Sequence, residues 1–267
     1  AGKGVGGGGG AGGWSAMQGT GAERGVKSSP LARGRQYVPP LRPHPLQAVT
    51  PGRRRPHVRM ALTFPTQLPQ TTMDLISRIS QQFQDSAQTK LDAVELLAAP
   101  IAEAVETMVN CLVNDGKILA CGNGPAAALS QLFVSQLVHR FETERPSLPA
   151  LALSADSILL SGVAADSGFA DVYAKQIRAL GQRGDIMLVL AGDGREKALV
   201  KAAEAALSRD MTIIALTGSD GGEIAGLLGP SDVEIRVPSA NMARILEVNL
   251  LCLQCLCDLI DRTLFPQ

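Results

Sequence analysis

The stretch KILACGNGPAAALSQL, residues 117–132, runs from a short apolar segment through the turn Gly122-Asn123-Gly124 into a helical pattern. A glycine turn at a helix N-terminus is a typical anion site, because free backbone N–H groups and the helix dipole point toward it. Pro125 and the alanines at 126–128 follow the turn, and none of these side chains offers a hydroxyl group or a charge. The segment therefore predicts the backbone of a phosphate site without the side chains that complete one.

Apolar runs of strand length alternate with helical patterns along the chain. The runs are residues 117–121, 150–153, 186–190, 212–216 and 233–237, and the helical patterns are 125–141, 169–181, 195–208 and 242–263. Continuous apolar strands separated by helices are typical of a parallel sheet that is covered on both faces. We expect a doubly wound α/β domain with five parallel strands in three layers, preceded by a helical region over about 73–115.

Ligands of such a sheet bind at the carboxyl ends of the strands, near the point where the strand order reverses. The turns at those ends are residues 122–125, 154–157, 191–196 and 217–222. We expect any site to be assembled from these loops and a neighbouring helix.

The formal net charge of the chain is zero, but the two parts of the chain differ in charge. Residues 1–72 contain ten Lys and Arg and the single acid Glu23, which leaves 15 basic and 24 acidic side chains for residues 73–267. The Gly, Pro and Arg content of residues 1–72 predicts a disordered tail. The preferred interpretation is that this tail is not native and that the protein starts at Met73 or Met60; a native nucleic-acid-binding tail and an organellar transit peptide are the alternatives.

Residues 73–267 are expected to form one domain. They show no secretory signal and no apolar run near the roughly 18 residues that cross a bilayer. The five cysteines of the chain show no paired framework, which predicts a reducing compartment, the cytoplasm.

Cys252, Cys255 and Cys257 lie within one predicted helix without a second cysteine pair, so buried thiols are favoured over a zinc site. We expect no metal and no cofactor.

The last helical pattern, residues 242–263, is apolar over most of its circumference. A helix of this kind is buried on nearly all sides, which one small domain rarely provides. The pattern favours a homo-oligomer, and a core helix within one subunit is the alternative.

The glycine turn also fits a loose G-x-G-x-x-[GA] pattern through Gly122, Gly124 and Ala127. Pro125 stiffens a turn that needs backbone freedom, and the acidic residues near the expected spacing follow a helix rather than a second strand. A dinucleotide-binding enzyme is therefore not favoured.

Segments across the domain resemble the SIS (sugar isomerase) domain family. They are CGNG (121–124), RFETERPSLPALAL (140–153), DVYAKQIRALGQRGD (171–185), RDMTIIALTGSDGGEIAGLLGP (209–230), DVEIRVPS (232–239) and CLCDLIDRTLFPQ (255–267). Within the family they are most similar to the DiaA branch, whose members associate with the bacterial replication initiator DnaA. Phosphoheptose isomerases resemble the chain less closely. The resemblance implies a tetrameric SIS fold that binds DnaA.

Isomerases of the family hold a phosphate with hydroxyl groups after the glycine turn and in a Ser-Thr-x-Gly-Asn-Ser loop. The resemblance places Ala126 at the first position, and the second loop is AGDGRE, residues 191–196. Ala191 offers no hydroxyl group, and Asp193 and Glu196 bring negative charge toward a dianion. We expect a degenerate pocket for phosphate, although the glycine amides leave room for an uncharged ligand.

Isomerases of the heptose type carry a His and Glu pair on the helix after the turn and a Gln and His pair on the last helix. The resemblance assigns these positions to Leu132, Gln136, Leu246 and Gln254. A leucine cannot ligate a metal, and a glutamine amide cannot transfer a proton near pH 7. We therefore expect no catalytic residues, with a phosphosugar isomerase or a phosphosugar sensor for the sedoheptulose 7-phosphate class as the alternative.

Other titratable residues remain. Glu247 and Asp166 match framework positions of the family, and either side chain is a candidate for the pocket. Helix capping and ion pairing are the more common uses of such residues. His139, the only histidine in residues 73–267, is expected at the surface and leaves no Ser-His-acid arrangement.

The C-terminal sequence DRTLFPQ places Leu264 and Phe265 before Pro266, where a helix ends. An exposed leucine and an aromatic ring are common contacts for a protein partner. The resemblance implicates this end of the chain in the DnaA contact, so Leu264 and Phe265 are the predicted partner-binding residues on a mobile terminus. Packing of both side chains against the oligomer is the alternative. DNA is then contacted by DnaA and not by the acidic domain.

Overall fold

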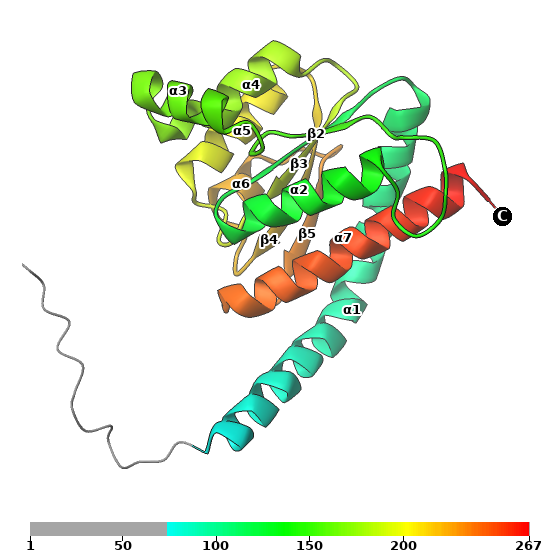
Figure 1. The fold of residues 1–267 in the computed structure, drawn as a ribbon, viewed down its shortest axis with the longest axis vertical. Helices are drawn as coiled ribbons and strands as arrows, with labels where there is room; N and C mark the ends of the chain where they lie inside the picture. Colours follow the sequence, from blue (N-terminus) through cyan, green and yellow to red (C-terminus); the bar gives the residue numbers. More distant parts are fainter. Residues whose placement is uncertain (1–73, 267) are drawn as a thin grey trace, which may run out of the picture. The chain divides into compact units, whose positions relative to one another are not determined.

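The computed structural model describes residues 74–266, and the predicted tail lies outside these residues. Five parallel strands form one sheet in the order β2-β1-β3-β4-β5 (Figure 1). The strands are Ile118–Gly122 (β1), Ala150–Ala152 (β2), Ile186–Leu190 (β3), Thr212–Gly218 (β4) and Val233–Val237 (β5). All five predicted strands are confirmed, because their apolar residues match a sheet that is covered on both faces.

The helices of the described residues are α1 (Leu75–Val113), α2 (Pro125–Val138), α3 (Ser157–Ser167), the 3-10 helix η1 (Phe169–Asp171), α4 (Val172–Leu180), α5 (Lys197–Leu207), α6 (Gly222–Leu227) and α7 (Met242–Leu264). The four predicted helical patterns correspond to α2, to η1 with α4, to α5 and to α7, and the predicted helical region before them is α1. Helices α3 and α6 have no counterpart among the predictions. A local signal for α3 exists, because Asp156 accepts a hydrogen bond from Leu159 N at 2.9 Å and Gly168 ends the helix.

Two buried clusters separate the three layers. Ile118 and Ala120 of β1 pack in the cluster formed with α1, α2 and α7, and the alternate residues Leu119 and Cys121 pack in the cluster with α3 to α6. Side chains of a strand alternate between faces, so one apolar run supplies both cores. The predicted three-layer α/β architecture is confirmed.

Helix α7 belongs to the first core. Ten of its residues are buried, among them Ile245, Leu253 and Leu256, while Leu251 and Leu259 remain exposed. Packing within one subunit therefore buries most of the apolar surface of α7, as expected for a core helix, the alternative to a homo-oligomer.

The N-terminal half of α1 projects beyond the sheet (Figure 1). The buried residues of this helix begin at Ala93, whereas Ile79 and Phe83 are exposed, with 74% of Phe83 accessible. One stretch of α1 has the length and apolar composition of a membrane-crossing helix. This corrects the expectation that no run approaches that length, and the same composition is found in helices that pack against protein. Much of the apolar surface of α1 is left without a cover in one subunit.

Candidate functional site

The sheet brings two predicted loops together. Strands β1 and β3 are paired, with Gly122 opposite Leu190, so the β1–α2 turn and the β3–α5 loop leave the same edge side by side. Strands β2 and β3 lie on opposite sides of β1, which makes this edge the point where the strand order reverses. The residues predicted from the two loops therefore share one site, which we call the switch-point site: Gly122, Asn123, Gly124, Ala126, Ala191, Asp193 and Glu196.

The β1–α2 turn accepts hydrogen bonds from the first two alanines of α2. Ala126 N donates to Asn123 O at 3.0 Å, Ala127 N donates to Gly124 O at 3.1 Å, and Pro125 has no N–H group. The sequence predicted free N–H groups at this helix N-terminus, and this prediction is wrong for Ala126 and Ala127. These two amides are therefore not free to bind an anion.

Gly122 is fixed by contacts from two helices. A Cβ atom at this position would lie 2.7 Å from the carbonyl oxygen of Ala126, so α2 approaches too closely for any other residue. Tyr173 of α4 donates its hydroxyl hydrogen to Gly122 O at 2.7 Å in a buried position. Burial raises the pKa of Tyr173 to about 12, so the hydroxyl group stays a donor and holds the turn.

Glu196 occupies the second loop with its own carboxylate. Its Oε1 atom accepts a hydrogen bond from Gly192 N at 3.1 Å, and its Oε2 atom is buried without a hydrogen-bond partner in the described residues. One loop amide is thus already bound to an internal anion. A bound phosphate would need to displace this carboxylate and would meet its charge.

Arg195 ties the β3–α5 loop to the loop after β4. Its Nη1 and Nη2 atoms donate to the two carboxylate oxygens of Asp220 at 2.9 and 2.6 Å, and Nη1 also donates to Asp193 O at 3.0 Å. Asp193 itself accepts a hydrogen bond from Arg195 N at 3.0 Å. The arginine is therefore engaged within the protein and is not directed at a ligand.

The hydrogen bonds from Arg195 lower the pKa of Asp220 to about 2 from its ordinary value of 3.8. Because the pKa of Asp220 is lower in the folded state, the stability that this contact contributes is fully present above pH 3.8. That contribution is lost as the pH falls through about 2. We expect Arg195→Gln to return the pKa of Asp220 toward 3.8, as measured by carboxyl-carbon NMR titration. An unchanged titration of Asp220 in this variant would contradict the contact, and Arg183→Gln is the control.

The start of α7 also reaches this edge. A Cβ atom at Gly192 would lie 2.1 Å from the methyl carbon of Met242, so this methionine covers the loop backbone. Met242 and Glu196 together cover the carboxyl end of β3.

The predicted helix positions do not form a catalytic group. Leu132 is exposed on α2, and Leu246 packs against the core from α7. Gln136 Oε1 lies 3.6 Å from Cys257 Sγ, which donates to it, and Gln254 is half-buried on α7. None of these four side chains is a base or an acid near neutral pH.

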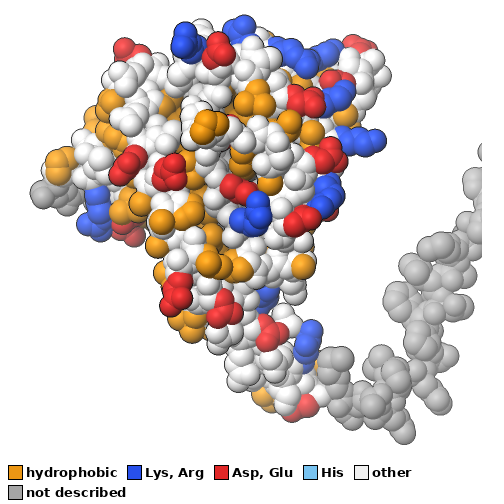
Figure 2. Space-filling view, turned by 180° about the vertical axis from the view of Figure 1, so that it is seen from behind, with side chains coloured by type: hydrophobic (Ala, Val, Ile, Leu, Met, Phe, Trp, Pro, Cys, Tyr) orange, Lys and Arg blue, Asp and Glu red, His pale blue; other side chains and the backbone are white. Residues whose placement is uncertain are grey.

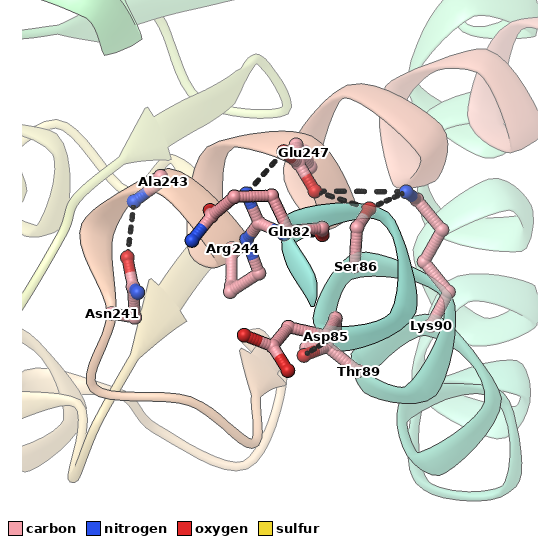
Figure 3. A network of polar contacts seen from close by, with 9 residues as sticks. All are labelled: Gln82, Asp85, Ser86, Thr89, Lys90, Asn241, Ala243, Arg244 and Glu247. Atoms are coloured by element: carbon pink, nitrogen blue, oxygen red, sulfur yellow. Dashed lines mark hydrogen bonds and ion pairs between the residues drawn. The ribbon is translucent and has the colours of Figure 1, made fainter. Parts of the chain in front are cut away.

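Glu247 faces α1 instead of the switch-point site (Figure 3). Its carboxylate accepts a hydrogen bond from Ser86 Oγ at 2.6 Å and pairs with Arg244 at 2.8 Å and Lys90 at 3.7 Å. Arg244 in turn donates to the backbone carbonyl of Gln82 at 2.8 Å. The structure thus places Glu247 in a contact that joins α7 to α1, in line with the ion pairing given as the more common use of such a residue. The partners on α1 could not be read from the sequence because they are far apart from Glu247 along the chain.

The predicted partner-binding residues are less exposed than expected. Helix α7 continues to Leu264, Phe265 forms its C-terminal cap, and both side chains are half-buried against the core cluster. The prediction of a freely exposed pair is wrong, although each side chain keeps an accessible part.

Next to this pair lies a buried ion pair that sequence reasoning missed. Arg145 Nε donates to Asp261 Oδ1 at 2.8 Å, and the two side chains are only 1% and 8% exposed. Arg145 also donates to the carbonyl oxygens of Gln136 and Leu137 at 2.8 and 2.6 Å. This single side chain fixes the loop after α2 on the last turns of α7.

The remaining candidates are surface or core residues. Asp166 is exposed on α3, and His139 is exposed at the end of α2. Cys252 and Cys257 are buried free thiols, and burial raises the pKa of each to about 12. No group of three or more His, Cys, Asp or Glu residues within 74–266 is placed to hold a metal ion.

Comparison with known proteins agrees with this architecture. The family model described as SIS domain matches residues 82–218. The chain belongs to the SIS domain family. The relatives of this SIS domain include the DnaA initiator-associating proteins DiaA of Erwinia tasmaniensis, 55% identical, and Salmonella paratyphi B, 54% identical. Each alignment spans 192 residues, 72% of this chain and 98% of the relative.

Solved structures of the SIS domain with the same fold carry an isomerase name. Phosphoheptose isomerase of Francisella tularensis is 42% identical with a TM-score of 0.70 and covers 71% of this chain and 100% of its own. Phosphoheptose isomerase GmhA of Neisseria gonorrhoeae is 41% identical with a TM-score of 0.67 and covers 70% of this chain and 98% of its own. The fold is therefore shared between an initiator-associating group and an enzyme group, and the residues of the site must separate them.

Proposed function

We propose that this chain is a non-catalytic SIS-domain protein of the cytoplasm that binds the replication initiator DnaA and promotes DnaA assembly at the chromosomal origin. The observation that carries the proposal is the identity of 54–55% over 98% of the length of proteins named for DnaA association.

The switch-point site supports a role without catalysis. The first turn of α2 donates to its own carbonyl groups, and Glu196 binds the amide of Gly192. The positions that the family resemblance assigns to acid, base and metal ligand are filled by leucine and glutamine. Proton transfer by the isomerase mechanism therefore lacks its groups.

The apolar surface of α1 supports self-association as a homotetramer. An exposed apolar stripe runs along one face of α1 and consists of Ile76, Ile79, Phe83, Leu91 and Val94. Val94 also lines an apolar groove of about 270 Å³ between α1 and α7, together with Leu97, Ile101, Val248 and Leu251. Figure 2 shows hydrophobic side chains gathered where the projecting helix leaves the body. A second copy of the chain would bury this surface, since stripes of apolar residues on helices pack against one another.

A homotetramer would carry several identical binding sites for DnaA. When one DnaA molecule is bound, the next site of the same assembly holds its partner at a high effective concentration. Ordered assembly of DnaA is thereby favoured without new contacts between the acidic domain and DNA.

The contact is proposed at Leu264 and Phe265, the accessible pair at the end of α7. We expect Leu264→Ala/Phe265→Ala to weaken binding of purified DnaA at least about tenfold, because central apolar contacts cost roughly 2 kcal/mol or more when truncated. The measurement is biolayer interferometry of the full chain against DnaA from the same organism.

The matched control is Ile158→Ala/Phe169→Ala, which removes an exposed isoleucine and an exposed phenylalanine on the opposite face of the sheet. Light scattering and thermal unfolding of both variants show whether assembly and fold are kept. Absence of DnaA binding by the unaltered chain at concentrations well above micromolar contradicts the proposed function. Equal loss in both double variants contradicts the assignment of the contact.

A phosphosugar ligand is the second candidate, and the structural similarity to phosphoheptose isomerases is the observation that favours it. A ligand that binds only the folded state raises the unfolding temperature. Stabilisation by sedoheptulose 7-phosphate, without turnover, would support a phosphosugar sensor, and aldose–ketose conversion would support the enzyme.

A further inference from the structure

A cavity of about 290 Å³ lies beside the C-terminal pair, and we call it the acidic cavity. The last turns of α7, the residues after it and the loop after α2 line the cavity: Phe141, Glu142, Thr143, Asp258, Asp261, Arg262, Phe265 and Pro266. Phe265 thus belongs both to the proposed partner contact and to the cavity wall. A protein that covers Phe265 also covers the mouth of this cavity.

A buried carboxylate oxygen in the cavity wall lacks a donor. Asp261 is 7% exposed, its Oδ1 atom accepts from Arg145 Nε, and its Oδ2 atom is buried without a hydrogen-bond partner in the described residues. A buried acceptor without a donor is costly, so such atoms are normally satisfied by protein, water or a ligand. Asp261 therefore keeps one unused acceptor next to the cavity.

The charges of the cavity favour a cation as that donor. Asp258 is paired with Arg262, whose Nε atom donates to both carboxylate oxygens at 2.9 Å. Asp261 is paired with Arg145. Glu142 acts on Arg262 through its charge alone. The lining thus holds three carboxylates, Glu142, Asp258 and Asp261, and the single guanidinium of Arg262, so carboxylates are in excess.

Two aromatic rings complete the wall. Phe141 and Phe265 line the cavity together with the carboxylates, and the face of an aromatic ring attracts an ammonium or guanidinium group. Rings and carboxylates together suit a long side chain with an apolar stem and a charged end.

We propose that the acidic cavity receives the side chain of one lysine or arginine of the bound protein partner. The proposal rests on the proposed function, because the partner is the protein that covers Phe265. It adds a charged contact that would orient the partner on the apolar pair, since a charge-assisted hydrogen bond has a defined direction.

The test compares two neighbouring glutamates of the full chain. We expect Glu142→Gln to weaken DnaA binding about tenfold, whereas Glu144→Gln, which removes the exposed partner of Arg140 outside the cavity, changes it less than about twofold. The salt dependence of binding should also become shallower in Glu142→Gln only. Both side chains are exposed, so neither substitution threatens the fold.

The outcomes separate the two proposals. Suppose that DnaA binding is lost in Leu264→Ala/Phe265→Ala but is equal in Glu142→Gln and Glu144→Gln. This result overturns the proposed role of the acidic cavity and leaves the proposed function standing. If the unaltered chain does not bind DnaA, the probe is argininamide and its control is uncharged citrullinamide. Binding of each compound is monitored by NMR through the ring resonances of Phe141 and Phe265. Saturable shifts with argininamide alone support a cation site, and no difference between the two compounds overturns it.

Discussion

Gly194→Ala is expected to destabilise the domain by about 3 kcal/mol, because it combines a positive backbone angle with a backbone overlap. Gly194 has φ of +71°, and a Cβ atom there would lie 1.9 Å from Gly221 O. Gly222, on the other side of this contact, also has no room for a side chain, since its Cβ atom would lie 2.3 Å from Asp193 O. Urea unfolding followed by circular dichroism measures the loss.

Gly162→Ala is the matched control for this substitution. Gly162 lies within α3, and a Cβ atom there meets no atom within 4 Å. Alanine in a helix is favoured over glycine, so we expect this variant to be more stable by about 0.5–1 kcal/mol. If both variants unfold at the same urea concentration, the close packing of the β3–α5 and β4–α6 loops is contradicted.

The same substitution bears on the covered switch-point site. Gly194 allows the β3–α5 loop to lie against the loop after β4, where Arg195 reaches Asp220. A larger side chain at residue 194 would force the loops apart and expose the carboxylate of Glu196. The domain thus uses a glycine contact, together with an ion pair, to keep this loop closed.

Arg145→Met is expected to destabilise the domain by about 3–5 kcal/mol, because it leaves a buried carboxylate without its cation. The substitution removes the donors to Asp261, Gln136 and Leu137 while keeping an apolar side chain of similar length. The free energy of unfolding from urea titration is the measurement.

Arg140→Met provides the comparison, because Arg140 lies five residues earlier in an exposed pair with Glu144. Its expected cost is below about 0.5 kcal/mol, as for most exposed ion pairs. Similar unfolding midpoints for the two variants would mean that Arg145 is not held in a buried network. Because Arg145→Met loosens the wall of the acidic cavity, loss of DnaA binding in that variant would report on folding, and Glu142→Gln remains the test of the cavity.

Local patterns were sufficient for the sheet and for most helices. The five strands are continuous apolar runs, and their period and length are properties of neighbouring residues. Of the two helices without a prediction, α6 has only six residues. Helix α3 has 11 residues, but its signals are single capping residues, Asp156 and Gly168, instead of an apolar period. Such signals are easily passed over because the same residues are common in loops.

The candidate site was predictable as a location and as a set of missing groups. The absence of hydroxyl groups at Ala126 and Ala191 follows from the residue types alone. What the site does with its remaining groups was not predictable. The sequence indicated repulsion by Glu196, whereas the structure shows that its carboxylate binds the amide of Gly192 inside the loop.

The sequence by itself determined the five strands and most of the helices in their order along the chain, the glycine turn at the carboxyl end of β1 and the membership of a family, because these depend on residue types at short spacing. Only the tertiary structure decided that Glu247 faces α1, that Arg145 pairs with Asp261 and that Phe265 is half-buried beside an acidic cavity. The physical reason is distance along the chain. Ser86 and Glu247 are 161 residues apart and Arg145 and Asp261 are 116 apart, so their contacts exist only after the helices have packed.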